Sequence, residues 1–278
     1  MLFHPPGVKT IFVVYEKQFY HYESQKMKTK VLIRSNQFSV QEKEAMWGIY
    51  QHYYRYSKAY FMERLGQQDQ FVLLKHGDQL VGFTGMKIRK VKIAGKWRRL
   101  IYFGQAVLHP SARGKSLLSA AAFLLCWKYW QDLLLGRICF WCDALSYKSY
   151  LLFAKSVESY YPSYQQQTPP AIDAVIQYIG ESHYTDSFCR QTGTVQKPQN
   201  YLDDPTVLVC PQDLADPDIS YYIRQNPGYQ KGNGLITVAP ITYKDLYMLA
   251  GRFLRKGWQK RRTKIQQIPA RREQVPAA

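Results

Sequence analysis

Residues 107–125 read VLHPSARGKSLLSAAAFLL, a stretch in which an apolar strand passes through a short basic turn into a helix. The strand pattern ends at His109-Pro110. From Ser116 the chain contains no glycine or proline until Gly136, so we expect one long helix over residues 114–133. The sequence therefore predicts a strand–turn–helix unit at the centre of the chain.

The turn of this unit has the chemistry of a phosphate-binding site. The first N–H groups of a helix lack partners within the helix, and the helix dipole favours an anion at that end. Gly114 allows close approach to the backbone, while Arg113 and Lys115 supply positive charge. The turn therefore predicts binding of a phosphorylated ligand, and a solvated basic turn is the alternative.

The segments around the unit predict an α/β fold. Ser39 and Glu42 have capping-box spacing before a helical pattern that runs to Phe61. Further strands are expected at 10–15, 31–34, 71–75, 80–91, 97–110, 137–144, 205–210 and 234–239, and further helices at 146–161 and 242–262. This order predicts a mixed, largely antiparallel sheet flanked by helices.

The chain shows no Pro/Gly-rich linker between two cores, so we expect a single domain over residues 1–265. Residues 162–200 are rich in Gln, Pro, Ser and Thr and are interpreted as a loop or insertion. Residues 266–278 are expected to form a basic flexible tail. The hydrophobic fraction of 46% excludes disorder over most of the length.

Positive charge is concentrated in two segments. The net charge is +18, with seven Lys/Arg in residues 87–99 and nine in residues 252–272. Clustered positive charge attracts acidic proteins, nucleic acids, anionic lipids or phosphorylated cofactors. An acidic partner of these two segments is therefore one expectation, and an ordinary basic surface is the other.

The cysteines do not predict a metal site. Cys139 and Cys142 form a lone C-x-x-C within a predicted strand, where residues three apart point to opposite faces. We therefore expect no bound metal and a reducing compartment. The first residues lack signal-peptide features, and Leu117 to Leu135 contains Lys128 and Asp132, so we expect a cytoplasmic protein without a transmembrane segment.

The central unit resembles the motif of the GNAT (N-acetyltransferase) superfamily, V-x-P-x-x-R-G-K-G-x-G/A, whose loop and helix start hold the pyrophosphate of CoA. Arg113, Gly114 and Lys115 match it, whereas Ser116 and Leu118 replace small motif residues. The resemblance implies a GNAT-like fold and acetyl-CoA or another acyl-CoA as co-substrate. The donor-binding residues that it implies are Ala106, Val107, Leu108, Arg113, Gly114, Lys115, Ser116, Leu117 and Leu118.

The downstream helix resembles the last conserved segment of that family, N-x-x-A-x-x-L-Y-x-K, in which Leu152 and Lys155 match. The family's general-acid tyrosine falls on Phe153, so the nearest hydroxyls are those of Tyr150, one helical turn earlier, and Tyr147. Of these, Tyr150 is the candidate acid. Packing of the Tyr150 ring in the core is the structural alternative.

Two further roles complete the expected chemistry. The candidate bases are Glu44, Glu63, His109 and Asp143. Asp143 comes at the end of a buried strand and could reach the cleft, with capping of the next helix as its alternative. By resemblance, a backbone N–H of Ala106 or Val107 would stabilise the oxyanion.

The sequence thus predicts an N-acyltransferase that moves an acetyl or longer acyl group from CoA to an unidentified amine, either a small molecule or a protein. The alternative is a non-catalytic relative of this fold that binds CoA or a protein partner, and the departures at Ser116, Leu118 and Phe153 favour this alternative. The basic segments favour a binder of nucleic acid or anionic surfaces. No P-loop, dinucleotide fingerprint or G-x-S-x-G pattern is present.

Overall fold

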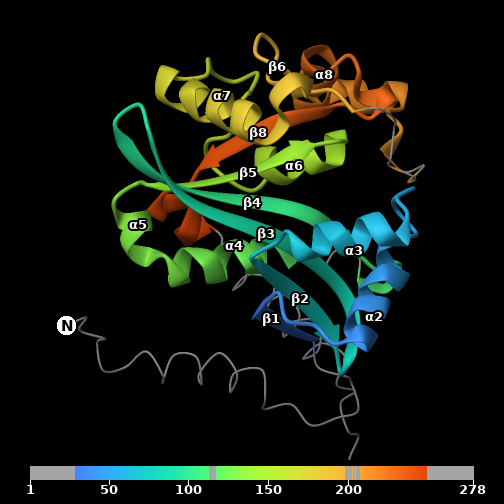
Figure 1. Cartoon of the computed structure of the whole chain (residues 1–278). Coiled ribbons are helices and arrows are strands. Elements are labelled where there is room, and N and C mark those ends of the chain that lie inside the picture. The colour runs from blue at the N-terminus through green and yellow to red at the C-terminus, as the bar shows by residue number, and fades with distance from the viewer. Residues whose placement is uncertain (1–28, 113–116, 198–201, 203, 205–206, 249–278) are drawn as a thin grey trace, which may run out of the picture.

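The computed structural model describes residues 29–112, 117–197, 202, 204 and 207–248. Within them an eight-stranded sheet runs in the order β1-β2-β3-β4-β5-β8-β7-β6 (Figure 1). The strands are β1 (Thr29–Ser35), β2 (Gln70–His76), β3 (Gln79–Ile93), β4 (Lys96–Leu108), β5 (Ile138–Ala144), β6 (Phe188–Cys189), β7 (Thr194–Val195) and β8 (Gly234–Pro240).

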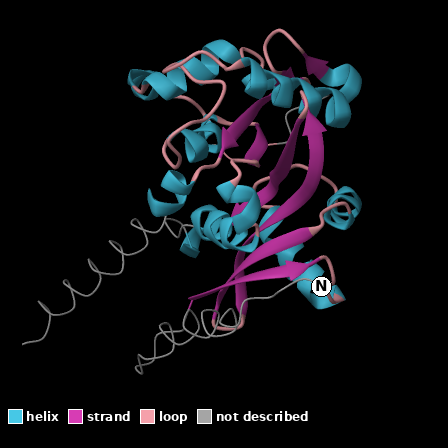
Figure 2. Cartoon of the chain, turned by 90° about the vertical axis from the view of Figure 1, so that its left-hand side faces the viewer, coloured by secondary structure: helices cyan, strands magenta, loops and turns pink. Residues whose placement is uncertain are grey.

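The sheet is antiparallel except between β4 and β5, which pair in parallel. Its long central hairpin, β3–β4, turns at Ala94 and Gly95, both with positive φ. Helices cover both sides of the sheet (Figure 2). The fold class predicted from the sequence, α/β with a mixed and largely antiparallel sheet flanked by helices, is confirmed.

Side chains along each strand point alternately to the two faces of the sheet, so apolar cores form on both faces. On one face α4 (Leu117–Lys128), α6 (Tyr147–Ala154) and α8 (Pro217–Gln225) cover the sheet. On the other face, α2 (Val40–Tyr50) and α3 (Lys58–Gly66) pack over β2 to β4, and α7 (Pro170–Tyr184) packs over β4, β5 and β8. Cys139 and Cys142 belong to cores on opposite faces, as the strand periodicity predicted.

Two predicted helices are interrupted. The helix expected from Ser39 to Phe61 ends at Tyr50, and a second helix starts after Ser57, whose side chain caps the N–H of Tyr60. The helix expected over residues 114–133 breaks at Tyr129, which has non-helical backbone angles, and continues as α5 (Trp130–Leu134). The Arg99 guanidinium lies 4.0 Å from the Tyr129 ring, a contact that helps to hold the ring at the break.

Three other predictions need correction. The region 162–200 contains the fifteen-residue helix α7, whose buried Ile172, Val175, Ile176 and Ile179 form an amphipathic stripe within a polar composition. The helix expected to reach residue 161 ends at Ala154, and the described residues 207–210 form no strand. Helix α8 was not predicted. The opening strand 10–15, the tail 266–278 and the final helix beyond residue 248 lie outside the described residues.

No helix in the described part of the chain is long and apolar enough to cross a membrane. The same residues contain no cluster of three or more His, Cys, Asp or Glu side chains able to hold a metal ion.

Candidate active site

The candidate site lies where β4 and β5 diverge. Their parallel pairing runs from Arg99 opposite Ile138 to Tyr102 opposite Trp141, whereas β4 continues to Leu108 and β5 to Ala144. A pocket of about 130 Å³ opens beyond the last pair. A water-sized group needs about 10–15 Å³ on this measure, so the pocket admits a small organic group.

The two faces of the sheet contribute different side chains to this pocket. Helices α4 and α6 supply a mainly apolar wall of Leu118, Ser149, Leu152 and Phe153. The opposite face supplies a polar wall of tyrosines and charged groups: Tyr50, Tyr54, Tyr56, Arg64, Tyr102, Asp143 and Lys197. An apolar and a polar substrate group could therefore meet between the strands.

A β-bulge shapes the β4 edge of the pocket. Phe83 pairs with Val107 and Gly85 pairs with Gly104, so Gln105 and Ala106 together stand opposite the single residue Thr84. The buried Thr84 hydroxyl donates to the Gly104 carbonyl at 3.1 Å. Gly104 is required because a Cβ there would lie 2.3 Å from the Tyr102 ring. The bulge turns Gln105, with φ of 51°, toward the pocket lining.

Asp143 is largely shielded from solvent and ion-paired in this pocket. Lys197 Nζ lies 3.0 Å from its Oδ2, the Tyr102 hydroxyl donates to its Oδ1 at 2.9 Å, and the Asp143 and Lys197 side chains are only 10% and 14% exposed. Burial alone would raise the pKa of Asp143, but Lys197, Arg64 and the Tyr102 hydrogen bond together hold it below the ordinary value. Asp143 is therefore a weak base, and its contacts favour an electrostatic role.

The pocket tyrosines are weak acids that keep their protons near neutral pH. Burial, with a smaller contribution from the negative charge of Asp143, raises the pKa of Tyr54 to about 12. The same two causes raise the pKa of Tyr102 well above its ordinary value. The rings of Tyr50 and Tyr54 stack at 4.5 Å, so this wall is a packed aromatic layer with its hydroxyls protonated.

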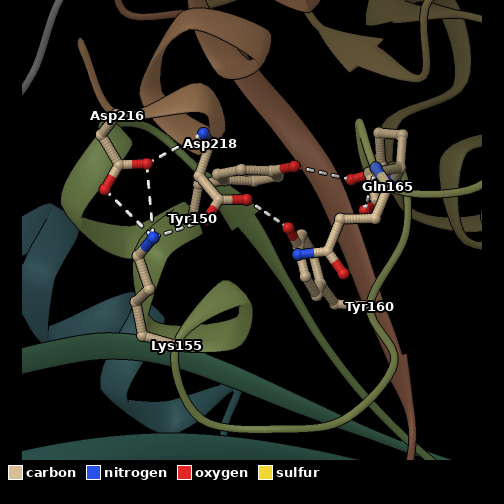
Figure 3. Close-up of polar contacts among 8 residues, drawn as sticks. Tyr150, Lys155, Tyr160, Gln165, Asp216 and Asp218 are labelled. Atoms are coloured by element: carbon tan, nitrogen blue, oxygen red, sulfur yellow. Dashed lines mark hydrogen bonds and ion pairs between the residues drawn. The ribbon is translucent and has the colours of Figure 1, made fainter. Parts of the chain in front are cut away.

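The structure places Tyr150 away from the pocket lining. Its buried hydroxyl donates to the Pro162 carbonyl at 2.9 Å. Figure 3 shows it beside Tyr160 and Asp218, at the junction of α6, the following loop and α8. In the same cluster Lys155 pairs with Asp216 and Asp218, and the Tyr160 hydroxyl donates to Asp218. This placement favours a structural role for Tyr150 over the acid role that its position on the helix suggested.

Removing the Tyr150 hydroxyl is therefore expected to change stability more than ligand binding. Tyr150→Phe leaves the Pro162 carbonyl without this donor in a buried setting, which should lower the free energy of unfolding by about 1–2 kcal/mol. Urea unfolding checks this, and acetyl-CoA affinity should stay at the parent value. Unchanged stability together with a lost activity would restore the acid role.

Of the predicted donor-site residues, Ala106 and Leu118 line the pocket together with Asp143. Val107 is buried in the β3–β4 ladder, and the Leu108 carbonyl accepts a hydrogen bond from the Tyr53 hydroxyl. Leu117, the first residue of α4, packs in the core. None of these three lines the pocket. The motif residues Arg113, Gly114, Lys115 and Ser116 lie outside the described residues, immediately before the start of α4.

Sequence reasoning did not identify most of the pocket lining, and the polar residues Arg64, Tyr102, Gln105 and Lys197 are among those that it missed. Arg64 lies on a short helix that was expected to belong to a longer one, and Lys197 lies in a segment interpreted as a loop. A glycine, Gly104, inside an otherwise apolar strand and directly before Gln105 was the signal in the sequence for a bulge.

No family profile matches this chain, and no curated protein matches it. Solved structures similar to it include a probable N-acyltransferase from Enterococcus faecalis V583, Arabidopsis thaliana Naa50 with a bisubstrate analogue, and the ribosomal-protein-S18-alanine N-acetyltransferase of Escherichia coli. The sequence identities are 14%, 13% and 12%, and the TM-scores are 0.34, 0.33 and 0.35.

These matches cover 45%, 51% and 77% of this chain, and 32%, 93% and 95% of the respective structures. The chain thus spans about a third of the Enterococcus protein. The three proteins carry names of the class that the central motif resembles. At TM-scores of this size the likeness carries no argument about activity, which has to come from the pocket.

Proposed function

We propose that the chain is an acyl-CoA-dependent N-acyltransferase whose donor and acceptor meet in the pocket between β4 and β5. The observation that carries this proposal is the divergence of two parallel strands directly beside the start of α4, the helix that follows the Arg113-Gly114-Lys115 turn. A donor anchored by its phosphates at that turn would direct its acyl end along the apolar wall.

The reaction requires few protein groups. A neutral amine attacks the thioester carbonyl, a C–N bond forms, the C–S bond breaks, and the CoA thiolate takes up a proton. Ala106, in the bulge and outside the regular β3–β4 register, offers a backbone N–H for the developing oxyanion. Water is our proposed carrier for the proton that the amine loses, because Asp143 is held as an ion-paired carboxylate.

Charge reversal at the motif tests the donor site. Arg113→Glu places a negative charge beside the pyrophosphate and should weaken acetyl-CoA binding at least tenfold, measured by calorimetry, with little change in melting temperature. Lys96→Glu is the matched control, since it makes the same charge change at the far end of β4. Equal acetyl-CoA affinity in Arg113→Glu and Lys96→Glu would place the pyrophosphate elsewhere.

A second candidate function is binding of a nucleic acid or another polyanion by the β3–β4 hairpin. Lys90, Lys92 and Lys96 are exposed there and make no ion pair with any residue that the structure describes. Arg89 and Arg99, by contrast, pair with Asp69 and Asp132. These three lysines, of which Lys90 lies over the Trp97 ring, would supply positive charge to a polyanion. Binding would then release the counterions held by the polyanion.

A further inference from the structure

The pocket carries an excess of positive charge. Its described lining includes two cationic side chains, Arg64 and Lys197, and one anionic side chain, Asp143. Lys197 and Asp143 are paired at 3.0 Å and neutralise each other. Arg64 therefore gives the described lining a net positive charge.

Arg64 lies on α3 and makes no ion pair within 4.0 Å among the described residues. Its guanidinium is partly buried, 5.8 Å from the centre of the Tyr60 ring. Burial lowers the pKa of nearby Lys87, and the positive charge of Arg64 lowers it further. The positive potential of Arg64 therefore acts on Lys87 as well. Burial would lower the pKa of Arg64, but Tyr102 and the negative charge of Asp143 raise it, so the guanidinium stays charged. No described carboxylate lies within 4.0 Å of it, so a ligand carboxylate could become its direct partner.

Gln105 gives a second, independent sign of a missing ligand. Its side chain lines the same pocket and is 7% exposed, yet neither its Nε2 nor its Oε1 has a hydrogen-bond partner in the described part of the chain. A buried amide without partners costs about 1–3 kcal/mol per unsatisfied group. Its backbone also holds a positive φ, a conformation that a non-glycine residue adopts at a further cost.

Resting on the proposed function, we propose that Arg64 binds a carboxylate of the acceptor, so that the acceptor is an amino acid: an amine that carries a carboxylate beside it. The guanidinium fork matches a carboxylate in bidentate geometry, and the Gln105 amide adds a donor in the same pocket.

A phosphate of the CoA donor has the same anionic chemistry and is the other source of charge for Arg64. The position of Arg64 favours the acceptor. Helix α3 covers one face of the sheet, whereas α4, the helix that follows the Arg113 turn, covers the opposite face. Arg64 thus lies on the side of the pocket away from the expected pyrophosphate.

The test compares amines that differ only by the carboxylate: phenylalanine with phenethylamine, histidine with histamine, and tyrosine with tyramine. Calorimetry on the CoA-saturated full chain measures binding, and thiol release from acetyl-CoA measures turnover. At least one amino acid should bind tenfold or more tightly than its decarboxylated partner. Arg64→Met, which keeps an unbranched side chain of similar length, should remove this advantage and leave acetyl-CoA affinity within twofold.

Lys58→Met is the control, because it removes a cation from the same helix at a site that is 48% exposed and pairs only with Glu44 among the described residues. It should keep the amino-acid preference. The proposal is overturned if no amino acid binds better than its amine, or if Arg64→Met loses acetyl-CoA affinity, which would assign Arg64 to the donor phosphates. If the chain binds an amino acid through Arg64 but does not bind acetyl-CoA, the proposed transferase function is wrong and the carboxylate site still stands.

Discussion

Replacing Asp143 with asparagine is expected to lower the free energy of unfolding by about 3–5 kcal/mol, because the substitution leaves the Lys197 ammonium buried without its partner. For a domain of this size each kcal/mol corresponds to about 2–4 °C, so the melting temperature should fall by about 6–20 °C. Thermal unfolding followed by circular dichroism measures the change.

The double variant Asp143→Asn with Lys197→Met separates this cause from lost packing. Replacing both partners of a buried pair is often nearly neutral, so the double variant should recover most of the lost stability. A loss that stays as large when Lys197 is also removed would mean that the pair is not the source of the effect.

The pH dependence of stability should follow the same carboxyl. The pKa of Asp143 is lower in the folded chain than in the unfolded chain, where an aspartate titrates near about 3.9. Its contribution is therefore fully present above that value and is lost as the pH falls through the folded pKa. The difference in stability between the parent and Asp143→Asn should be largest above pH 5 and should shrink at lower pH.

Acetyl-CoA is expected to stabilise the chain by about 2.7 kcal/mol at a concentration 100 times its dissociation constant. At about 2–4 °C per kcal/mol, the melting temperature should rise by about 5–11 °C. Free CoA and a longer acyl-CoA, measured beside it, would show whether the acyl group adds to the affinity. Absence of any shift with all three ligands would remove the donor site and the proposed transferase together.

The strand pattern predicted β1 to β5 and β8 because their signals are local, but it did not predict the two-residue strands β6 and β7. The hairpin turns at Gly77 and Gly95, the buried apolar run of β5 and the capping box at Ser39 each act within a few residues. Helix ends were less predictable. Tyr129 ends α4 in contact with Arg99, thirty positions away in the sequence, and no local residue marks that break.

The site was predictable only in part, for the same physical reason. Asp143 could be found because it lies at the end of a buried strand, and Ala106 and Leu118 because they lie beside and within the central motif. Lys197, which pairs with Asp143, and Arg64, which faces the same pocket, come from segments far apart in the sequence. Only the folded sheet brings these two side chains to one place.

The position of β5 within the sheet affects how this part of the chain folds as it is synthesised. β5 has only four paired residues with β4, and its other edge is covered by β8, which begins at Gly234. Until β8 leaves the ribosome, the strand that carries Asp143 exposes one full row of backbone N–H and C=O groups. A chain that ends before β8 would therefore carry an open apolar edge beside the pocket, and such an edge invites pairing with other chains.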